Sequence, residues 1–343
     1  MLEEDPQDIT FQYNRPERER GYNDPIILKR KRRTTMKQHH RMALGYCITI
    51  LGGVCWAIGG ACGQTLFEQN SITSDWVVPI RLLLAGTLLV VFSALSGKHP
   101  MAVWKDKKNY PPLIAFGLIG SALCQYGYYT SIQYSNAAFA TVLSYTAPVM
   151  ILVYTVVKEH RAPRLYELAA VLLVALGAFS CATQFKLGAL HIAPPALIWG
   201  LLSAVAFAFY TITPQKLIRE YSLLPIVGWG MILGGIVLAF LCRPWTVAVT
   251  VNAHLFIMLA GVIFLGTICS FCFYQAGVSI VGGLAGSILS AAEPVTSVII
   301  STLLLHVLFT PFDLAGFVMI LTAIPLIAVG EHWSEKHAAS LSI

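Results

Sequence analysis

A carboxylate stands inside an apolar stretch of the chain, in the run SILSAAEPVTSVI at residues 287–299. Glu293 is followed directly by Pro294, although apolar segments avoid both residue types. An acid within hydrocarbon costs several kcal/mol and by default marks a functional site. Two kinds of chemistry suit such a residue: coupling to protons, or a counter-charge for a cationic solute.

The residues around this acid follow the spacing of one helical face. Gly286, Ser290, Glu293, Ser297 and Ser301 recur at steps of three and four residues, and residues at these steps are neighbours on a helix. Small residues alone would indicate close helix packing. Packing does not explain the acid, which lies about halfway along its apolar segment.

Two prolines predict breaks in the helices that carry them. A proline lacks the N–H that would bond the carbonyl four residues earlier. Pro148 therefore frees the carbonyl of Ser144, and Pro294 frees that of Ser290. Two explanations fit: a serine hydroxyl and a neighbouring helix repair a kink, or the carbonyls line a cavity, as in discontinuous transporter helices.

Aromatic residues recur where the apolar segments would enclose a cavity. Such rings usually serve packing, but a Tyr hydroxyl in lipid needs a partner, which favours an inward orientation. Five of them are predicted to surround a bound solute together with the acid and the two serines: Trp56, Tyr128, Tyr145, Tyr210 and Tyr274.

Arg81 is a second charge within an apolar run, in VVPIRLLLAGTLL. It lies near one end of its segment, where a long side chain can snorkel to water. Glu68 and Asp75 are the candidate ion-pair partners in the preceding stretch. We expect snorkelling or ion pairing for this residue, with contact to a solute as the alternative.

The composition places these residues in a membrane protein. Of 343 residues, 56% are hydrophobic and only 12% are charged, and the mean hydropathy is +0.68. Soluble domains carry about 25% charged residues. Residues 1–41 hold ten of the 23 Lys and Arg, so the net charge of +6 reflects a basic arm rather than a surface for nucleic acid.

The arm at residues 1–42 lacks hydrophobic periodicity and is predicted to be disordered and cytoplasmic. We interpret it as a solvated segment that follows the positive-inside rule, with attraction to anionic lipid as the alternative. Met36 is a second candidate for the start of translation.

Motifs of the common enzyme classes are absent from the sequence, which has no phosphate-binding glycine loop, no GxSxG and no HExxH. Cys269 and Cys272 form a CxxC, but further ligands for a metal are missing around them. We therefore expect no catalysis, no metal and no cofactor.

Ten apolar segments are long enough to cross a bilayer, which takes about 20 residues each. They cover residues 43–66, 76–96, 111–133, 136–157, 165–183, 195–216, 223–242, 253–277, 283–305 and 311–330. The short connections leave no room for a soluble domain between them. The prediction is an all-α integral membrane fold that ends in a short cytoplasmic tail at residues 331–343.

The two halves of this array resemble each other. At an offset of 146 residues, the serine and proline at 144 and 148 recur at 290 and 294, whereas Glu293 falls opposite Ala147. The predicted repeats span residues 43–183 and 195–330, with five segments each. Because five is odd, the repeats cross the membrane in opposite directions. Inverted repeats are typical of secondary transporters, whose solute site lies near the midplane.

Lys and Arg are concentrated in alternate connections. The positive-inside rule then places both termini in the cytoplasm. The connections that hold Lys158, Arg161, Arg164, Lys216 and Arg219 fall on the same side.

Three stretches resemble the EamA-type carriers of the drug/metabolite transporter superfamily: IRLLLAGTLL, ATVLSYTAPVMILVYTVVKEH and GSILSAAEPVTSVIISTLLL. The resemblance covers about residues 43–330. It implies ten helices in the cell membrane, both termini in the cytoplasm, alternating access and a central cavity between the repeats. Members of this family often export amino acids or related metabolites, and Glu293 stands at their frequent Glu-Pro position.

Three functions remain open at this stage. The first is a secondary transporter of small metabolites, working as an exporter and coupled to protons through Glu293. The second is a multidrug or cation efflux carrier of the same fold. The third is a membrane scaffold or receptor without turnover.

Overall fold

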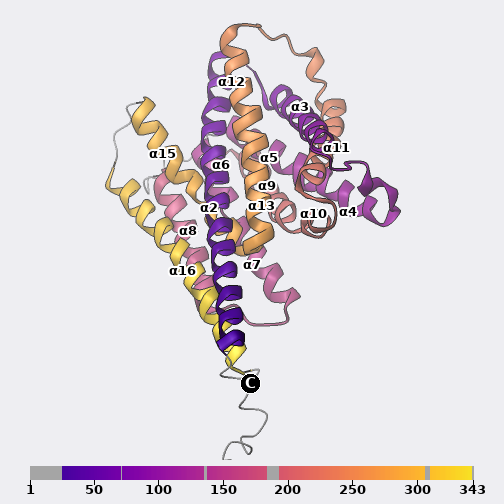
Figure 1. The fold of residues 1–343 in the computed structure, drawn as a ribbon. Coiled ribbons are helices and arrows are strands. Elements are labelled where there is room, and N and C mark those ends of the chain that lie inside the picture. Colours follow the sequence, from indigo (N-terminus) through magenta and orange to yellow (C-terminus); the bar gives the residue numbers. More distant parts are fainter. Residues whose placement is uncertain (1–24, 71, 135–136, 184–192, 306–309, 342–343) are drawn as a thin grey trace, which may run out of the picture. The chain divides into compact units, whose positions relative to one another are not determined.

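The computed structural model describes residues 25–70, 72–134, 137–183, 193–305 and 310–341, and these ranges are helical with no strand. The chain divides into residues 1–44 and residues 45–343. The described portion of the first part is the beginning of helix α2 (Pro25–Asn70). Every contact reported below belongs to the second part, whose helices are shown in Figure 1.

The remaining helices of the first repeat are α3 (Ser74–Leu95), α4 (Tyr110–Ala115), the π-helical segment η4 (Phe116–Leu123), α5 (Cys124–Tyr134), α6 (Ala137–Ser144), α7 (Ala147–Lys158) and α8 (Leu165–Thr183). Those of the second repeat are α9 (Pro194–Ile212), α10 (Gln215–Tyr221), α11 (Leu223–Cys242), α12 (Ala253–Ile263), the π-helical segment η7 (Phe264–Cys269), α13 (Ser270–Val281), α14 (Gly283–Leu289), α15 (Ala292–Leu305) and α16 (Pro311–Leu341). The described connections contain three short 3-10 turns: η2 (Ala102–Lys105), η3 (Lys107–Asn109) and η6 (Pro244–Thr246).

The described helices account for each of the ten predicted segments. Eight of them are long and apolar enough to cross a membrane, and a shorter apolar helix covers Leu165–Ser180. The segment predicted at residues 111–133 is occupied by α4, η4 and α5 in direct succession. Its polar residues distinguish it from the uniformly apolar helices.

The basic arm differs from the sequence prediction in the part that is described. Residues 1–24 lie outside the described ranges, but residues 25–42 belong to α2. Pro25 suits the first position of a helix, where no N–H is needed. The Lys, Arg, Gln and Met residues that follow have high helix propensity. The prediction of disorder therefore needs correction from Pro25 onward.

Matching breaks interrupt one helix in each repeat. α6 ends at Ser144 and α7 begins at Ala147, while α14 ends at Leu289 and α15 begins at Ala292. Pro148 is the second residue of α7 and Pro294 the third residue of α15, as expected for a residue that cannot continue the hydrogen-bond ladder. The duplicated serine–proline pair thus coincides with a duplicated interruption of the helix.

Matching π-helical segments also occur in both repeats. At the offset of 146 residues, η4 corresponds to residues 262–269, a range that contains η7. Such segments are rare and are found frequently at functional sites. Both lead directly into helices that line the cavity described below.

The two repeats cross through paired close contacts. An added Cβ at Gly59 of α2 would lie 2.1 Å from the Cα of Gly266 in η7, and one at Gly120 of η4 would lie 3.1 Å from the Cα of Tyr210 in α9. The first helices of the two repeats align at a different offset, 151 residues, at which Gly59 corresponds to Tyr210. Gly120 corresponds to Gly266 at 146 residues, so the two contacts are counterparts. Glycine permits this close approach of backbones.

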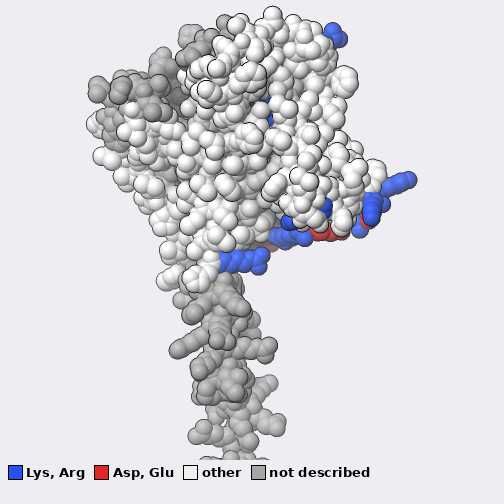
Figure 2. Space-filling model, turned by 45° about the horizontal axis from the view of Figure 1, so that its top comes forward, with Lys and Arg blue, Asp and Glu red and all other residues white. Residues whose placement is uncertain are grey.

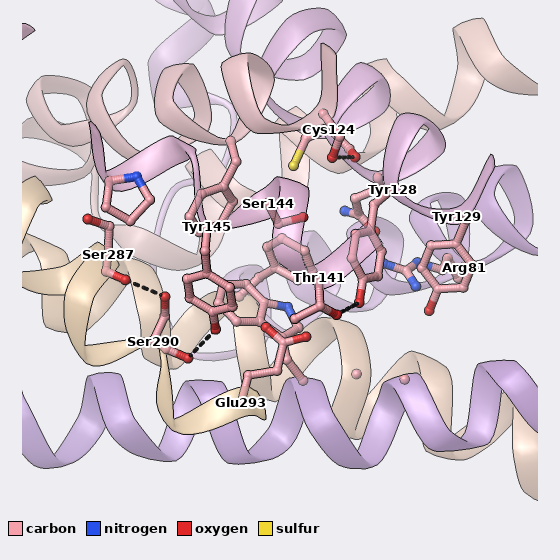
Figure 3. A pocket seen from close by; sticks show the side chains of 18 residues that line it. Arg81, Cys124, Tyr128, Tyr129, Thr141, Ser144, Tyr145, Ser287, Ser290 and Glu293 are labelled. Atoms are coloured by element: carbon pink, nitrogen blue, oxygen red, sulfur yellow. Dashed lines mark hydrogen bonds between the residues drawn. The ribbon is translucent and has the colours of Figure 1, made fainter. Parts of the chain in front are cut away.

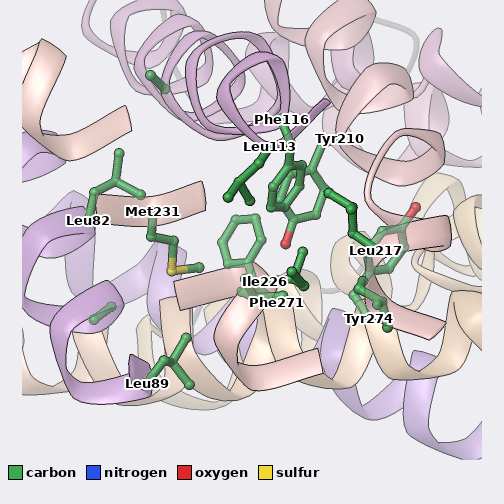
Figure 4. Packing of buried hydrophobic residues seen from close by; sticks show 14 of the residues in the cluster. Leu82, Leu89, Leu113, Phe116, Tyr210, Leu217, Ile226, Met231, Phe271 and Tyr274 are labelled. Atoms are coloured by element: carbon green, nitrogen blue, oxygen red, sulfur yellow. The ribbon is translucent and has the colours of Figure 1, made fainter. Parts of the chain in front are cut away.

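The core lies where these crossings meet. Phe116, Tyr210 and Phe271 are buried together (Figure 4), with ring centroids 5.1 Å apart for Phe116 and Tyr210 and 5.2 Å apart for Tyr210 and Phe271. Aromatic rings at such distances contribute packing energy beyond their buried area. This cluster fixes the helices on one side of the cavity.

The outer helices form two corresponding pairs, because α3 packs along α11 and α8 packs along α16 (Figure 1). Large apolar side chains such as Leu95, Leu165 and Phe240 are exposed on the outside of the bundle. In Figure 2, most charged side chains in view gather along one edge, whereas the broad face is uncharged. This distribution suits a bundle surrounded by lipid.

Candidate functional site

A cavity of about 90 Å³ lies between the two repeats (Figure 3). Its walls come from α2, α3, α5, α6 and α7 on one side and from α9, η7, α13, α14 and α15 on the other. Eight of the predicted site residues line it: Trp56, Arg81, Tyr128, Ser144, Tyr145, Pro148, Ser290 and Glu293.

Glu293 occupies the first turn of α15, directly after the break. Its N–H bonds the carbonyl of Ser290 at 2.9 Å, which holds the turn together. The carboxyl group points into the cavity (Figure 3), which Tyr128 and Thr141 also line. The Tyr128 hydroxyl lies 3.1 Å from that of Thr141. The break thus places an acid beside two hydroxyl groups.

The carbonyl that Pro294 frees is the carbonyl of Ser290, and it lies in the cavity wall. The hydroxyl of Tyr145 donates to it at 3.2 Å across the repeat boundary. The Ser290 hydroxyl donates to the carbonyl of Ser287 at 2.8 Å, and that of Ser144 to Ala140 at 3.0 Å. In the second repeat, the freed carbonyl therefore accepts a hydrogen bond from the other repeat and also borders the cavity.

Arg81 enters the same cavity from α3 and is 3% exposed. Its Nη2 donates to Oε1 of Gln125, and its guanidinium lies 4.5 Å from the centre of the Tyr129 ring. The expected ion pair with Asp75 is absent, because that carboxylate accepts from the Tyr126 hydroxyl at 2.7 Å. The side chain turns inward rather than snorkelling, which corrects the sequence prediction.

Glu68 cannot be assessed as a partner, since its side chain lies outside the described residues. Within the described part of the chain, Arg81 has no carboxylate partner, and its Nε has no hydrogen-bond partner. A buried cation of this kind is costly unless an anionic group compensates it. The cavity therefore offers one cationic and one acidic side chain to a bound solute.

Tyr210 and Tyr274 do not line the cavity, which corrects their prediction as contacts of a solute. Tyr274 is fully buried, packs against Trp56 with centroids 5.0 Å apart, and shares a hydrogen bond of 2.8 Å with Thr211. Tyr210 is buried in the aromatic core. Both rings fill crossings between helices and support the cavity wall from behind.

Two stretches of the chain, residues 43–183 and 194–329, match the model of the EamA-like transporter family. The chain belongs to this family. It is a multi-pass membrane transporter built from two repeats.

A relative in Salmonella typhimurium, the uncharacterized inner membrane transporter YicL, is 35% identical to this EamA-like transporter over 285 residues, which are 83% of this chain and 95% of YicL. A solved crystal structure has the same fold with a TM-score of 0.68, covering 83% of this chain and 96% of its own. Its sequence identity of 13% makes it a likeness of fold alone.

Several residues of the EamA-like cavity were missed at the level of sequence, notably Gln125, Thr141 and Ser203. Gln125 had a usable signal, because a polar side chain within an apolar segment needs a partner. Its counterpart in the second repeat is Phe271, so repeat matching alone drew no attention to it.

The sequence predicts no metal site at the CxxC formed by Cys269 and Cys272. The structure places Cys269 and Cys272 at the junction of η7 and α13. Among the described residues, no group of His, Cys, Asp and Glu could hold a metal ion.

Proposed function

We propose that this EamA-like protein is a secondary transporter that exports small zwitterionic metabolites, amino acids or related compounds, by alternating access. One observation carries the proposal: Arg81 and Glu293 line one cavity, and neither has an ion-pair partner within the described ranges. A zwitterion would place its carboxylate at the guanidinium and its ammonium at the acid. The guanidinium suits a carboxylate because its planar donors match two oxygens.

The alternating-access part of the proposal rests on the two repeats. Inverted repeats with broken helices place the solute near the midplane and let one half rock against the other. Glu293 would alternate between the solute and a proton, which provides the coupling. By analogy with YicL, we place the chain in the inner membrane, and by the positive-inside rule both termini in the cytoplasm.

A second candidate is efflux of organic cations. Trp56, Phe207 and Phe271 line the cavity together with Glu293, and aromatic faces next to an acid attract cations without requiring a carboxylate. This candidate gives Arg81 no role in recognition. The two functions therefore differ in whether the substrate must carry a carboxylate.

The test uses proteoliposomes with the purified full chain and a pH gradient. Amino acids are compared with their decarboxylated amines and with quaternary ammonium ions. We expect transport of the amino acids alone, and we expect Glu293→Gln to abolish its dependence on the gradient. Asp106→Asn is the control, since that acid is bonded to Lys108 outside the cavity.

Other results would redirect the proposal. Transport of the amines in preference to the amino acids would identify the cation carrier. Wild-type rates and unchanged pH dependence in Glu293→Gln would remove the coupling role. No transport of any of the solutes tested would favour a scaffold or receptor.

A further inference from the structure

A second and larger cavity, of about 1000 Å³, lies at one end of the bundle. Three connections surround it: the loop between α7 and α8, the junction of α9 and α10, and the turn between α13 and α14. The positive-inside rule assigns the first two, which hold the Lys and Arg, to one side of the membrane. The alternation of the predicted spans assigns the third to the same side, and the structure brings all three together around one space. We call this cavity the basic vestibule.

Charged side chains line the basic vestibule. Its five cations are Lys158, Arg161, Arg164, Lys216 and Arg219, and its three carboxylates are Glu159, Glu167 and Glu220. The lining therefore has a net charge of +2. A cavity with walls of one predominant sign concentrates ions of the other sign.

Arg161 has a structural role in the wall of the vestibule, because it is bonded to two neighbouring carboxylates. Its Nη1 and Nη2 donate to the two oxygens of Glu167 at 2.8 and 2.6 Å, and its Nε donates to Glu159 at 2.6 Å. Glu167 also accepts from the N–H of Arg164 at 2.8 Å. These bonds raise the pKa of Arg161 further above its ordinary value. These hydrogen bonds fix the loop between α7 and α8, and they pair two of the three carboxylates, Glu159 and Glu167, with Arg161.

The other four cations have no ion pair in the described part of the chain. Two of them are positioned by rings instead. The Nζ of Lys158 lies 5.4 Å from the centre of the Tyr154 ring, and Arg164 donates to the Tyr166 hydroxyl at 2.8 Å. Neither contact neutralises charge, so both cations remain available to an anion.

Lys216 and Arg219 stand three residues apart on α10. Residues at this spacing share a helical face, so the two cations present a pair to the vestibule. The remaining carboxylate, Glu220, also lines this wall.

The basic vestibule is separate from the central cavity. Along α7 and α9 the two spaces are divided by about one helical turn, since Pro148 and Phe207 line the central cavity and Ile151 and Thr211 line the vestibule. The hydrogen bond between the hydroxyls of Thr211 and Tyr274 lies in this dividing layer. A ligand in the vestibule therefore contacts neither Arg81 nor Glu293.

We propose that the basic vestibule is a binding site for a phosphate-bearing anion, held by Lys158, Arg164, Lys216 and Arg219. Four cations without an ion pair favour a ligand that carries more than one negative charge. A single carboxylate carries only one. A phosphate monoester carries about −1.5 to −2 near neutral pH and accepts charged hydrogen bonds through several oxygens. The phosphate belongs either to a soluble anion or to a lipid headgroup, because basic pockets at the cytoplasmic ends of helices suit both.

The experiment measures thermal unfolding of the purified full chain in a neutral detergent. The probes are inorganic phosphate, dihexanoyl phosphatidic acid and, as a zwitterionic control, dihexanoyl phosphatidylcholine, all at constant ionic strength. A ligand that binds the folded state raises the unfolding midpoint in a saturable manner. We expect this rise with inorganic phosphate, with phosphatidic acid or with both, and none with phosphatidylcholine.

The paired variant Lys216→Gln/Arg219→Gln is expected to abolish the rise. Lys105→Gln/Lys107→Gln removes the same charge from exposed residues outside the vestibule and should keep it, as should Glu293→Gln. If the first pair fails to fold, Lys158→Gln combined with Arg164→Gln makes the same test from the opposite wall. A rise with phosphatidic acid alone would identify a lipid headgroup.

Two outcomes would overturn the site: no saturable rise with either phosphate probe, or a rise that survives both vestibule variants. Either result would leave the proposed transport function untouched, because that function is tested through the central cavity.

Discussion

The hydroxyl of Tyr145 in the first repeat donates a hydrogen bond of 3.2 Å to the main-chain carbonyl of Ser290 in the second. Pro294 supplies no N–H to that carbonyl, which accepts instead from the Glu293 N–H at 2.9 Å and from Tyr145. The carbonyl at the break in the second repeat therefore accepts a hydrogen bond from a side chain of the first repeat. The same carbonyl approaches Gly53 of α2, where an added Cβ would lie 2.8 Å from its oxygen. Movement of one repeat against the other must change this contact.

Tyr145→Phe is expected to lower the free energy of unfolding by about 1 kcal/mol, the usual contribution of one hydrogen bond between helices in a membrane. Unfolding in mixed micelles measures this change. Tyr134→Phe, at an exposed position of α5, should leave the free energy unchanged. An equal loss in both variants would show that the hydrogen bond between Tyr145 and Ser290 carries no particular stability.

Gly59→Ala should destabilise the protein strongly, whereas Gly60→Ala should not. A Cβ at Gly59 meets the backbone of Gly266 at 2.1 Å, and nothing lies within 4 Å of one at Gly60. Overpacking of this kind costs about 1–3 kcal/mol or more, and a clash with backbone leaves little room for relaxation. Thermal unfolding of the two neighbouring variants tests the difference. Similar midpoints would contradict the close crossing of α2 and η7.

The sequence was sufficient to predict the helices and the repeats because both leave local signals. Apolar length marks a span, and matching residues at one offset mark a duplication. The acid Glu293 could be singled out by the same reasoning, since its counterpart is Ala147. The prolines located the two breaks to within a few residues, because the missing N–H acts only on the carbonyl four residues earlier.

The orientation of individual side chains could not be predicted in this way. Arg81 was expected to snorkel, but its guanidinium points inward because Gln125 and Tyr129 offer it a hydrogen bond and a ring. Tyr210 was expected in the cavity, yet it packs between Phe116 and Phe271. Both outcomes depend on partners far away in the sequence, and hydropathy contains no information about such contacts.

Pro294→Ala is expected to reduce transport without reducing stability. The variant restores an N–H that can bond the Ser290 carbonyl, which would straighten the junction of α14 and α15 and compete with Tyr145. Pro325→Ala is a matched control, because Pro325 also lies within a helix, α16, and does not line the cavity. Initial rates in proteoliposomes give the comparison. Equal rates in the two variants would argue that the break has no role in the transport cycle.

Arg81→Lys should weaken recognition of substrates that carry a carboxylate, although the charge is retained. Lysine lacks the planar fork of donors that bonds two oxygens at once, and it stacks less well on the Tyr129 ring. Loss of one charged hydrogen bond costs about 1.5–3 kcal/mol, which corresponds to a rise in KM of about tenfold or more. Concentration-dependent uptake of an amino acid measures this rise. Arg243→Lys, at an exposed turn before η6, should keep the wild-type KM. If amino-acid uptake by Arg81→Lys has an unchanged KM, the guanidinium does not hold the substrate carboxylate, and the cation carrier becomes the better account of the cavity.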